Sequence, residues 1–280
     1  MPDYAAARDA ERLIRIALDE DLPGPDATTL AVGLAGRAAA AVFVAKQACT
    51  VSGLAVASRV FAIVDPAVRF EALARDGETV ARGAELGRVS GDAASLLAAE
   101  RTALNFLQRL CGIATATRAL VDAVAGTGCL VLDTRKTTPG WRLLEKAAVR
   151  HGGGTNHRFS LSDGVLIKDN HVLLAGGVAA AVGVARAHAL PGTRIEVEAG
   201  TLAQVEEALA AGADVILLDN AEPALAREAV ALVAGRAVLE LSGGITLENA
   251  RAMAASGADC ISSGALTHSA PAVDISLEFL

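Results

Sequence analysis

A stretch of 21 residues, HGGGTNHRFSLSDGVLIKDNH (151–171), places three consecutive glycines beside three histidines, an arginine and a lysine. Basic side chains next to Gly-rich backbone are typical of a site that holds an anion, because glycine lets backbone N–H groups approach oxygen atoms closely. The chain as a whole is acidic, with a formal net charge of −7. The sequence therefore predicts an anion site that is built locally, in a protein with no general attraction to nucleic acid or to an anionic membrane.

Positive charge gathers in one part of the chain. Residues 131–171 carry a net charge of +3 before any histidine is protonated. Their cations are Arg135, Lys136, Arg142, Lys146, Arg150, Arg158 and Lys168. An exposed helix face explains the three that are spaced four apart from residue 142 to residue 150. It does not explain the adjacent pairs Arg135–Lys136 and His157–Arg158, or Lys168.

Polar residues end a series of short apolar runs that begins at Cys129. The runs CLVLD, VLIK, RIEVE and VILLD end at Asp133, Lys168, Glu198 and Asp219, AVLEL precedes Ser242, and DCISS precedes Gly264. From Lys168 onward these positions are 30, 21, 23 and 22 residues apart, and an Ala-rich segment follows each run. Alternating strands and helices predict parallel strands with right-handed crossovers. We expect an α/β barrel, with a doubly wound open sheet as the alternative.

In a barrel the carboxyl ends of the strands converge on one mouth, so these polar residues are expected to meet there. An arginine fork suits a carboxylate and a lysine suits a phosphate. Glu198 and Asp219 suit Mg²⁺ held together with a phosphorylated ligand, or they neutralise Lys168 in the empty protein. Glu196 faces the same way as Glu198 but deeper, and we assign it no chemistry.

Two glycine-containing turns follow the last two runs. LSGGIT contains Ser242, Gly243 and Gly244, and SSGALTHS contains Ser263, Gly264 and His268. Backbone N–H groups in late barrel loops often bind phosphate, so both turns are candidate phosphate sites.

The remaining candidates are isolated histidines and one arginine. We place His157 near the substrate because it neighbours Arg158, and we leave the roles of His151 and His171 open. Arg101 lies on the packing row of a helix, three residues before Leu104. Either its aliphatic stem packs along the edge of that apolar row, or its guanidinium group reaches the active site of another subunit.

The elements that must position these groups start with a small α+β unit. We expect helices over 3–20, 52–62 and from the N-cap Asp92 to about residue 125, with Gly112 as a possible break. Strands are expected at AAAAVFVA, VRFEAL and AELGRVS. The four cysteines form no CxxC pair, which favours reduced thiols. No signal-peptide core or membrane-spanning run stands out, so we expect a soluble cytoplasmic protein.

Taken together, these segments resemble the quinolinate phosphoribosyltransferases. The resemblance runs in order through DLPGPDATT, ERTALNFLQRLCGIAT, LDTRKTTPGWR, HGGGTNHR, LIKDNH, EVE, ILLDN, SGGIT and SSGALTHS. It implies an α/β class fold: a small α+β N-terminal domain (1–112, with a tail of about 270–280 that packs back on it) and an incomplete parallel α/β barrel (113–269). It also implies a homodimer whose sites are completed across the interface, with assembly beyond the dimer left open.

The resemblance also implies the roles of the site residues. Arg135, His157 and Arg158 would hold the carboxylates of quinolinate, and Arg101 would come from the partner chain. Lys136 and Lys168 would contact phosphoribosyl pyrophosphate and the carboxylate region. Glu198 and Asp219 would bind Mg²⁺ and the ribose. Phosphate would be held by Ser242, Gly243, Gly244, Ser263 and Gly264, with His268 nearby.

Two rival functions share this fold. A paralogue associated with molybdenum transport lacks a lysine equivalent to Lys168, so LIKDNH argues against it. A non-catalytic binder of phosphorylated ligands would not need both Glu198 and Asp219 beside the basic cluster. The sequence thus favours a Mg²⁺-dependent transferase that acts on quinolinate.

Overall fold

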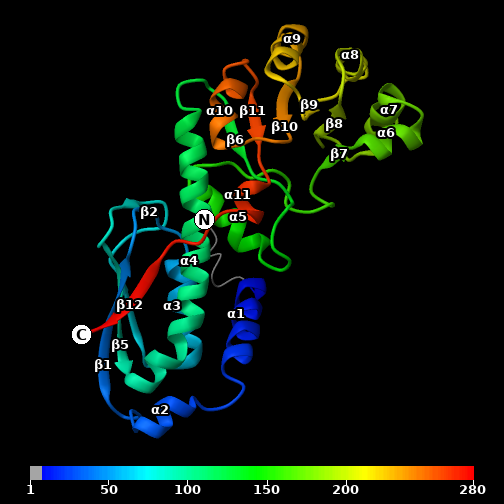
Figure 1. Cartoon of the computed structure of the whole chain (residues 1–280). Helices are drawn as coiled ribbons and strands as arrows, with labels where there is room; N and C mark the ends of the chain where they lie inside the picture. The colour runs from blue at the N-terminus through cyan, green and yellow to red at the C-terminus, as the bar shows by residue number, and fades with distance from the viewer. Residues whose placement is uncertain (1–7) are drawn as a thin grey trace. The chain divides into compact units, whose positions relative to one another are not determined.

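The computed structural model describes residues 8–280, so the first five residues of the helix expected over 3–20 lie outside the described part. The chain forms two compact units (Figure 1). The first unit comprises Met1–Arg118, Thr137–Gly153 and Leu266–Leu280. The second, here called the barrel unit, comprises Ala119–Lys136 and Gly154–Ala265. Each unit is therefore built from segments that are separated in the sequence.

The first unit contains helices and strands from the amino-terminal half of the chain and from two later segments. They are α1 (Arg8–Asp21), α2 (Ala27–Val32), β1 (Ala38–Ala45), β2 (Cys49–Thr50), α3 (Leu54–Val64), β3 (Arg69–Ala72), β4 (Thr79–Val80), β5 (Glu85–Asp92), α4 (Ala93–Ala123), α5 (Arg142–His151), α11 (Ala265–His268) and β12 (Ile275–Phe279). Its main sheet has the order β12-β1-β5-β3, so the last strand of the chain pairs with the first. Phe43, Phe61 and Phe70 pack ring against ring between this sheet and α3.

Helix α4 is longer and more continuous than the sequence suggests. Asp92 caps it as predicted, because its Oδ1 accepts the N–H groups of Ala94 (3.0 Å) and Ser95 (3.4 Å). Gly112 does not break it, so that prediction is wrong. A Cβ at Gly112 would lie 2.1 Å from the carbonyl oxygen of Pro271. The glycine is needed there because another backbone segment packs against the helix.

The exposed helix face that could explain Arg142, Lys146 and Arg150 is wrong for Lys146, although Arg150 is exposed. That helix is α5, and Lys146 is only 1% exposed in the first unit. On the same helix Glu145 is fully buried and accepts from Arg109 Nη2 at 3.2 Å. A spacing of four residues fixes a common helix face, but it does not say whether that face meets solvent.

The barrel unit carries the alternating elements expected from the sequence. They are β6 (Leu130–Leu132), β7 (Val165–Ile167), α6 (Asp169–Ala175), α7 (Val178–His188), β8 (Ile195–Ala199), α8 (Leu202–Ala210), β9 (Val215–Asp219), α9 (Pro223–Val233), β10 (Val238–Ser242), α10 (Leu247–Ala254) and β11 (Cys260–Ser262). Figure 1 shows the helices α7 to α10 along the outer side of these strands.

The strand order decides between the two folds that the sequence left open. The six strands form one parallel sheet in the order β6-β11-β10-β9-β8-β7. This is the cyclic order of a barrel with a single break between β6 and β7. A doubly wound sheet would instead reverse its winding direction in the middle. The predicted incomplete parallel barrel is confirmed, and the open-sheet alternative is wrong.

The cysteines and the helix lengths add two facts about the molecule. All four cysteines are free thiols and buried. Among residues 8–280, no single helix is long and apolar enough to cross a membrane, and α6 with α7 reaches that length only as a pair bent by 91°.

Candidate active site

A cavity of about 350 Å³ opens in the barrel unit at the carboxyl ends of the strands. Its lining residues are Thr134, Arg135, Lys136, His157, Arg158, Leu166, Lys168, Leu217, Asp219, Glu240, Ser242 and Ser262. Seven of the residues predicted for the site therefore share one cavity. We call it the cationic pocket, because four of these side chains are arginine or lysine.

Strand register explains why these side chains meet. Asp219 pairs with Ser242 across β9 and β10, and Leu217 pairs with Glu240 two residues earlier. Residues in register on parallel strands face the same side of the sheet, and alternate residues along one strand do so too. Each strand therefore sends one side chain to the mouth and another to a deeper layer.

Lys168 follows β7 and meets the end of the neighbouring strand β8. Its Nζ lies 3.2 Å from Glu198 Oε2, and the lysine side chain is 51% exposed while the glutamate is 16% exposed. The backbone N–H of Lys168 donates to His171 Nδ1 at 3.0 Å, which caps helix α6. The structure thus assigns His171 a local structural contact, and it leaves the ammonium group of Lys168 at the pocket.

The segment after α5 is fixed by Asp133, which is fully buried at the end of β6. Asp133 Oδ1 accepts the backbone N–H of His157 at 2.8 Å, and Oδ2 accepts Asn156 Nδ2 at 2.5 Å. Thr155 also forms a parallel bridge with Leu132. Because the segment runs beside β6 like a further strand, His157 and Arg158 reach the inner side of the barrel.

Arg158 and Arg135 both line the pocket and lie near each other. The guanidinium of Arg158 donates to the carbonyl oxygen of Gly164 at 3.0 Å. Burial, and then the positive charge of Arg135, lower the pKa of Arg158. Two guanidinium groups that repel each other in this way gain stability when an anion binds between them.

The turn after β10 packs tightly on the turn after β9. Gly243 has a φ of 83°, and a Cβ there would lie 2.3 Å from Asn220 Oδ1. Asn220 itself donates its N–H to the carbonyl of Ser242 at 2.8 Å. Gly243 is therefore required both by its left-handed backbone and by the close approach of Asn220.

Other predicted residues do not line this cavity. Glu198 does not line the cavity, but it contacts Lys168, which does. The lining also lacks Gly243, Gly244, Ser263 and Gly264. Ser263 is buried and donates to the carbonyl of Ile245 at 3.2 Å. Arg101 and His268 belong to the first unit, where both are exposed. His151 also lies there, with its Nδ1 2.8 Å from Ser52 Oγ.

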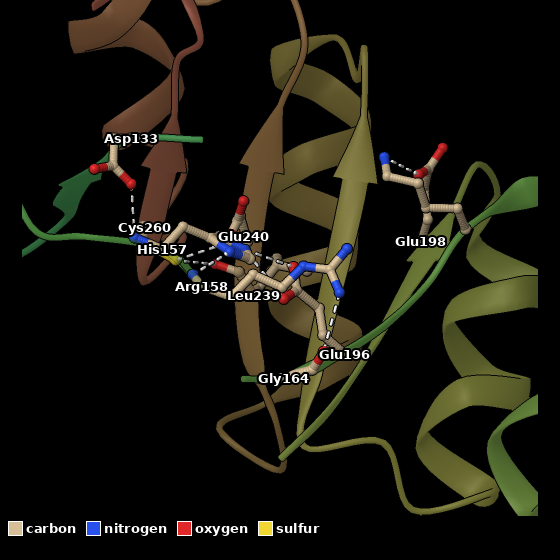
Figure 2. Close-up of polar contacts among 10 residues, drawn as sticks. Asp133, His157, Arg158, Gly164, Glu196, Glu198, Leu239, Glu240 and Cys260 are labelled. Carbon is tan, nitrogen blue, oxygen red and sulfur yellow. Dashed lines mark hydrogen bonds and ion pairs between the residues drawn. The ribbon is translucent and has the colours of Figure 1, made fainter. Parts of the chain in front are cut away.

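Sequence reasoning missed two glutamates that surround His157 at the inner part of the cationic pocket. His157, Glu196 and Glu240 place their ligand atoms within 4.8 Å of one another, and we call them the buried triad (Figure 2). Glu196 was seen but given no role, and Glu240 was passed over. The signal was present, because each of these glutamates lies two residues before a predicted site residue on the same strand.

One carboxylate oxygen of the triad lacks a hydrogen-bond donor, although Ser262 and Cys260 also donate to Glu240. His157 Nε2 lies 3.1 Å from Glu196 Oε2 and 3.5 Å from Glu240 Oε2. Glu240 is 2% exposed, and its Oε1 has no hydrogen-bond partner. Burial, and then the negative charge of Glu196, raise the pKa of Glu240 to about 7. A second cavity of about 410 Å³ lies on the other side of the triad, toward the amino ends of the strands.

Comparison with known proteins agrees with this geometry. Residues 26–111 match the family described as quinolinate phosphoribosyl transferase, N-terminal domain, and residues 113–278 match the C-terminal domain of the same family. The chain belongs to the quinolinate phosphoribosyltransferase family. The family resemblance predicted from the sequence is therefore confirmed.

Individual relatives of this chain come from plants and bacteria. It is 45% identical over 175 residues to the chloroplastic carboxylating nicotinate-nucleotide pyrophosphorylase of Arabidopsis thaliana, which covers 62% of the chain and 50% of that protein. A probable enzyme of the same name from Synechocystis is 43% identical over 181 residues, covering 65% of the chain and 61% of that protein. The chain thus spans about half the length of the plant relative that it matches.

Solved structures match over nearly the whole chain. NadC from Streptococcus pyogenes is 42% identical with a TM-score of 0.93, covering 96% of both chains. The nicotinate-nucleotide pyrophosphorylase from Francisella tularensis is 37% identical with a TM-score of 0.94, covering 100% of this chain and 98% of that chain. These matches confirm the fold class independently of the strand order.

Proposed function

We propose that this chain transfers the phosphoribosyl group of 5-phosphoribosyl 1-pyrophosphate to quinolinate with decarboxylation. The products are nicotinate mononucleotide, pyrophosphate and CO₂, which makes the reaction a step of de novo NAD biosynthesis. One observation carries the proposal: Arg135, Arg158 and Lys168 come from three separate segments and meet in one cavity. The printed names of the plant, cyanobacterial and bacterial relatives support it.

The first task of the site is to hold two polyanions next to each other. Quinolinate carries two carboxylates, and the planar guanidinium groups of Arg135 and Arg158 match them. His157 lies beside these arginines in the same pocket. Lys136 and Lys168 supply point charges for the phosphoribosyl donor. Fixing both reactants in one geometry removes much of the entropic cost of a bimolecular step.

The reaction then needs charge stabilisation more than a nucleophilic side chain. The pyridine nitrogen forms its bond to the anomeric carbon as the bond to pyrophosphate breaks, and pyrophosphate leaves with the electron pair. Lys136 and Lys168 stabilise that departing charge. The C–CO₂ bond next to the quaternary nitrogen then breaks and CO₂ leaves. Its electron pair stays on the ring carbon, where the adjacent positive nitrogen stabilises it, and that carbon takes a proton from water.

We also propose Mg²⁺ at Glu198 and Asp219. Both residues offer hard carboxylate oxygens at the ends of neighbouring strands, the type of ligand that Mg²⁺ prefers together with a substrate phosphate. Bound there, the ion would neutralise charge on pyrophosphate. Phosphate oxygens would meet the turns that contain Ser242, Gly243, Gly244, Ser263 and Gly264, with His268 nearby.

The proposed active enzyme is a cytoplasmic homodimer in which Arg101 acts on the partner chain's site. Arg101 is exposed on α4, as this role requires. Mixing chains that carry Arg101→Ala with chains that carry Lys168→Ala tests the idea. If the two defects lie in different halves of one composite site, mixed dimers regain one working site. No recovery despite confirmed chain exchange would reject the role in trans.

The function itself is tested by supplying the purified protein with quinolinate, Mg²⁺ and phosphoribosyl pyrophosphate. We expect release of CO₂ and formation of nicotinate mononucleotide in equal amounts, and loss of both when EDTA removes the metal. The control replaces quinolinate by nicotinate, which lacks the carboxylate that leaves. Turnover of nicotinate alone would contradict the proposal.

A further inference from the structure

The buried triad contains two carboxylates and one proton donor. The backbone N–H of Arg158 donates to His157 Nδ1 at 2.8 Å, so that nitrogen is an acceptor and carries no proton. The ring proton therefore sits on Nε2, which points at Glu196 Oε2 and Glu240 Oε2 (Figure 2). A neutral histidine offers only this one proton to the two acids. Both carboxylates cannot be ionised there without a large cost in electrostatic repulsion.

The groups around Glu240 show which acid is the better proton carrier. It faces Glu196 on β8, His157 on the segment after α5, and Cys260 and Ser262 on β11. On β9 its register partner is the apolar Leu217, and Asp219 at the end of that strand lines the same cavity. The nearby guanidinium of Arg158 is held by the carbonyl of Gly164, and it favours Glu196.

Of the two glutamates in the triad, Glu240 therefore lies where a negative charge is less stable. It is 2% exposed and its Oε1 has no hydrogen-bond partner, whereas the Glu196 side chain is 10% exposed. Charged residues farther along the second cavity are Asp163, Arg194 and Asp259. A proton from solvent can be placed on Oε1 without breaking any contact that the carboxyl group now makes.

A resident metal ion is a poorer explanation of the triad. A metal on Nε2 normally requires the other ring nitrogen to donate a hydrogen bond, but Nδ1 of His157 accepts one. The histidine would have to lose its ring proton entirely or break its contact with the Arg158 backbone. The same contacts need no rearrangement when the site is occupied by a proton.

We infer that Glu240 is a positioning residue of the quinolinate pocket, which fixes His157 from below together with Glu196 and becomes a neutral carboxylic acid when the dianionic substrate binds. The inference rests on the proposed function, because it assigns a substrate to this pocket. A proton on Glu240 removes one of two negative charges that lie under the incoming carboxylates. Substrate binding and proton uptake therefore favour each other.

The direction of the pH effect follows from this linkage. Below neutrality Glu240 already carries its proton, and binding needs no further uptake. Above neutrality the proton must come from solvent, so affinity for quinolinate falls as pH rises, by up to about tenfold per pH unit. Affinity for phosphoribosyl pyrophosphate should change much less if that substrate does not lie over the triad.

Glu240→Gln provides the sharpest test, because glutamine has the shape and neutrality of a protonated glutamate. We expect the KM for quinolinate in this variant to stay nearly constant between pH 6 and pH 9, while the wild-type value rises above neutrality. The ratio of the two KM values cancels any ionisation of quinolinate itself. Glu206→Gln, which removes a charge from the exposed surface of α8, is the matched control and should follow the wild type.

A second measurement avoids the variant altogether. Calorimetry of quinolinate binding to the wild-type protein, in two buffers of different ionisation enthalpy, counts the protons taken up. We expect uptake of up to about one proton per site at pH 8.5 and almost none at pH 6. Equal proton counts at both values, or parallel pH profiles for wild type and Glu240→Gln, would overturn the inference. Normal turnover in those experiments would still support the proposed function.

Discussion

The cationic pocket and the buried triad share His157 and Glu240, yet the outer and the inner side chains of this region differ in charge and exposure. Lys168 in the pocket is 51% exposed, whereas Glu240 in the triad is 2% exposed. Arginine and lysine gather in the outer part of the pocket, and two glutamates gather in its inner part, at the triad. In this barrel the residue at a strand end lies at the mouth, and the residue two positions earlier lies deeper on the same face.

The largest effect is expected from removing a lysine that lines the pocket. Lys168→Ala should lower kcat by about 10³-fold, because charge on the departing pyrophosphate loses a preorganised partner. Steady-state product formation measures the loss, and circular dichroism checks the fold. Arg227→Ala, which removes an exposed cation from α9, is the matched control. Near-normal turnover of the Lys168 variant would remove the pocket from the mechanism.

A smaller and more selective effect is expected at the arginine pair. Arg158→Ala should raise the KM for quinolinate by about 10- to 100-fold, the cost of a charge-assisted hydrogen bond to a carboxylate. The KM for phosphoribosyl pyrophosphate should change little. Arg158→Lys keeps the charge but loses the planar fork, so it should recover only part of the affinity. Equal increases for both substrates would show that the two binding regions are not distinct.

A third effect separates the triad from the pocket by stability, with no change expected in the kinetics at low pH. Because burial raises the pKa of Glu240 to about 7, the folded protein binds a proton that the unfolded chain releases near pH 4.5. The stability of the wild type should therefore fall as pH rises from about 4.5 to 7, by on the order of 3 kcal/mol. Glu240→Gln should lack this loss and melt above the wild type at pH 8. Thermal unfolding at pH 5.5 and pH 8 measures the difference.

Much of this arrangement could be predicted from the sequence because period and spacing are local signals. The regular distances between Lys168, Glu198, Asp219 and Ser242 identified one βα unit after another. The structure confirms the barrel through the strand order. Which of these side chains share a cavity depends on strand register, and no single segment contains that information.

Other features could not be predicted because they depend on contacts between distant segments. Gly112 has the composition of a helix breaker, but its role is to admit the Pro271 backbone. Lys146 has the spacing of an exposed cation, yet it is only 1% exposed. The sequence predicts that Glu240 lies two residues before Ser242 on the same face of the strand. Only its contact with His157 in the structure indicates a role for it.

The position of bound quinolinate tests the central claim most directly. In a crystal structure with this ligand, we predict both carboxylates within about 3 Å of nitrogen atoms of Arg135, Arg158 or Lys168, above His157 and the buried triad. Quinolinate bound outside this cavity, or with its carboxylates turned away from these cations, would contradict the account.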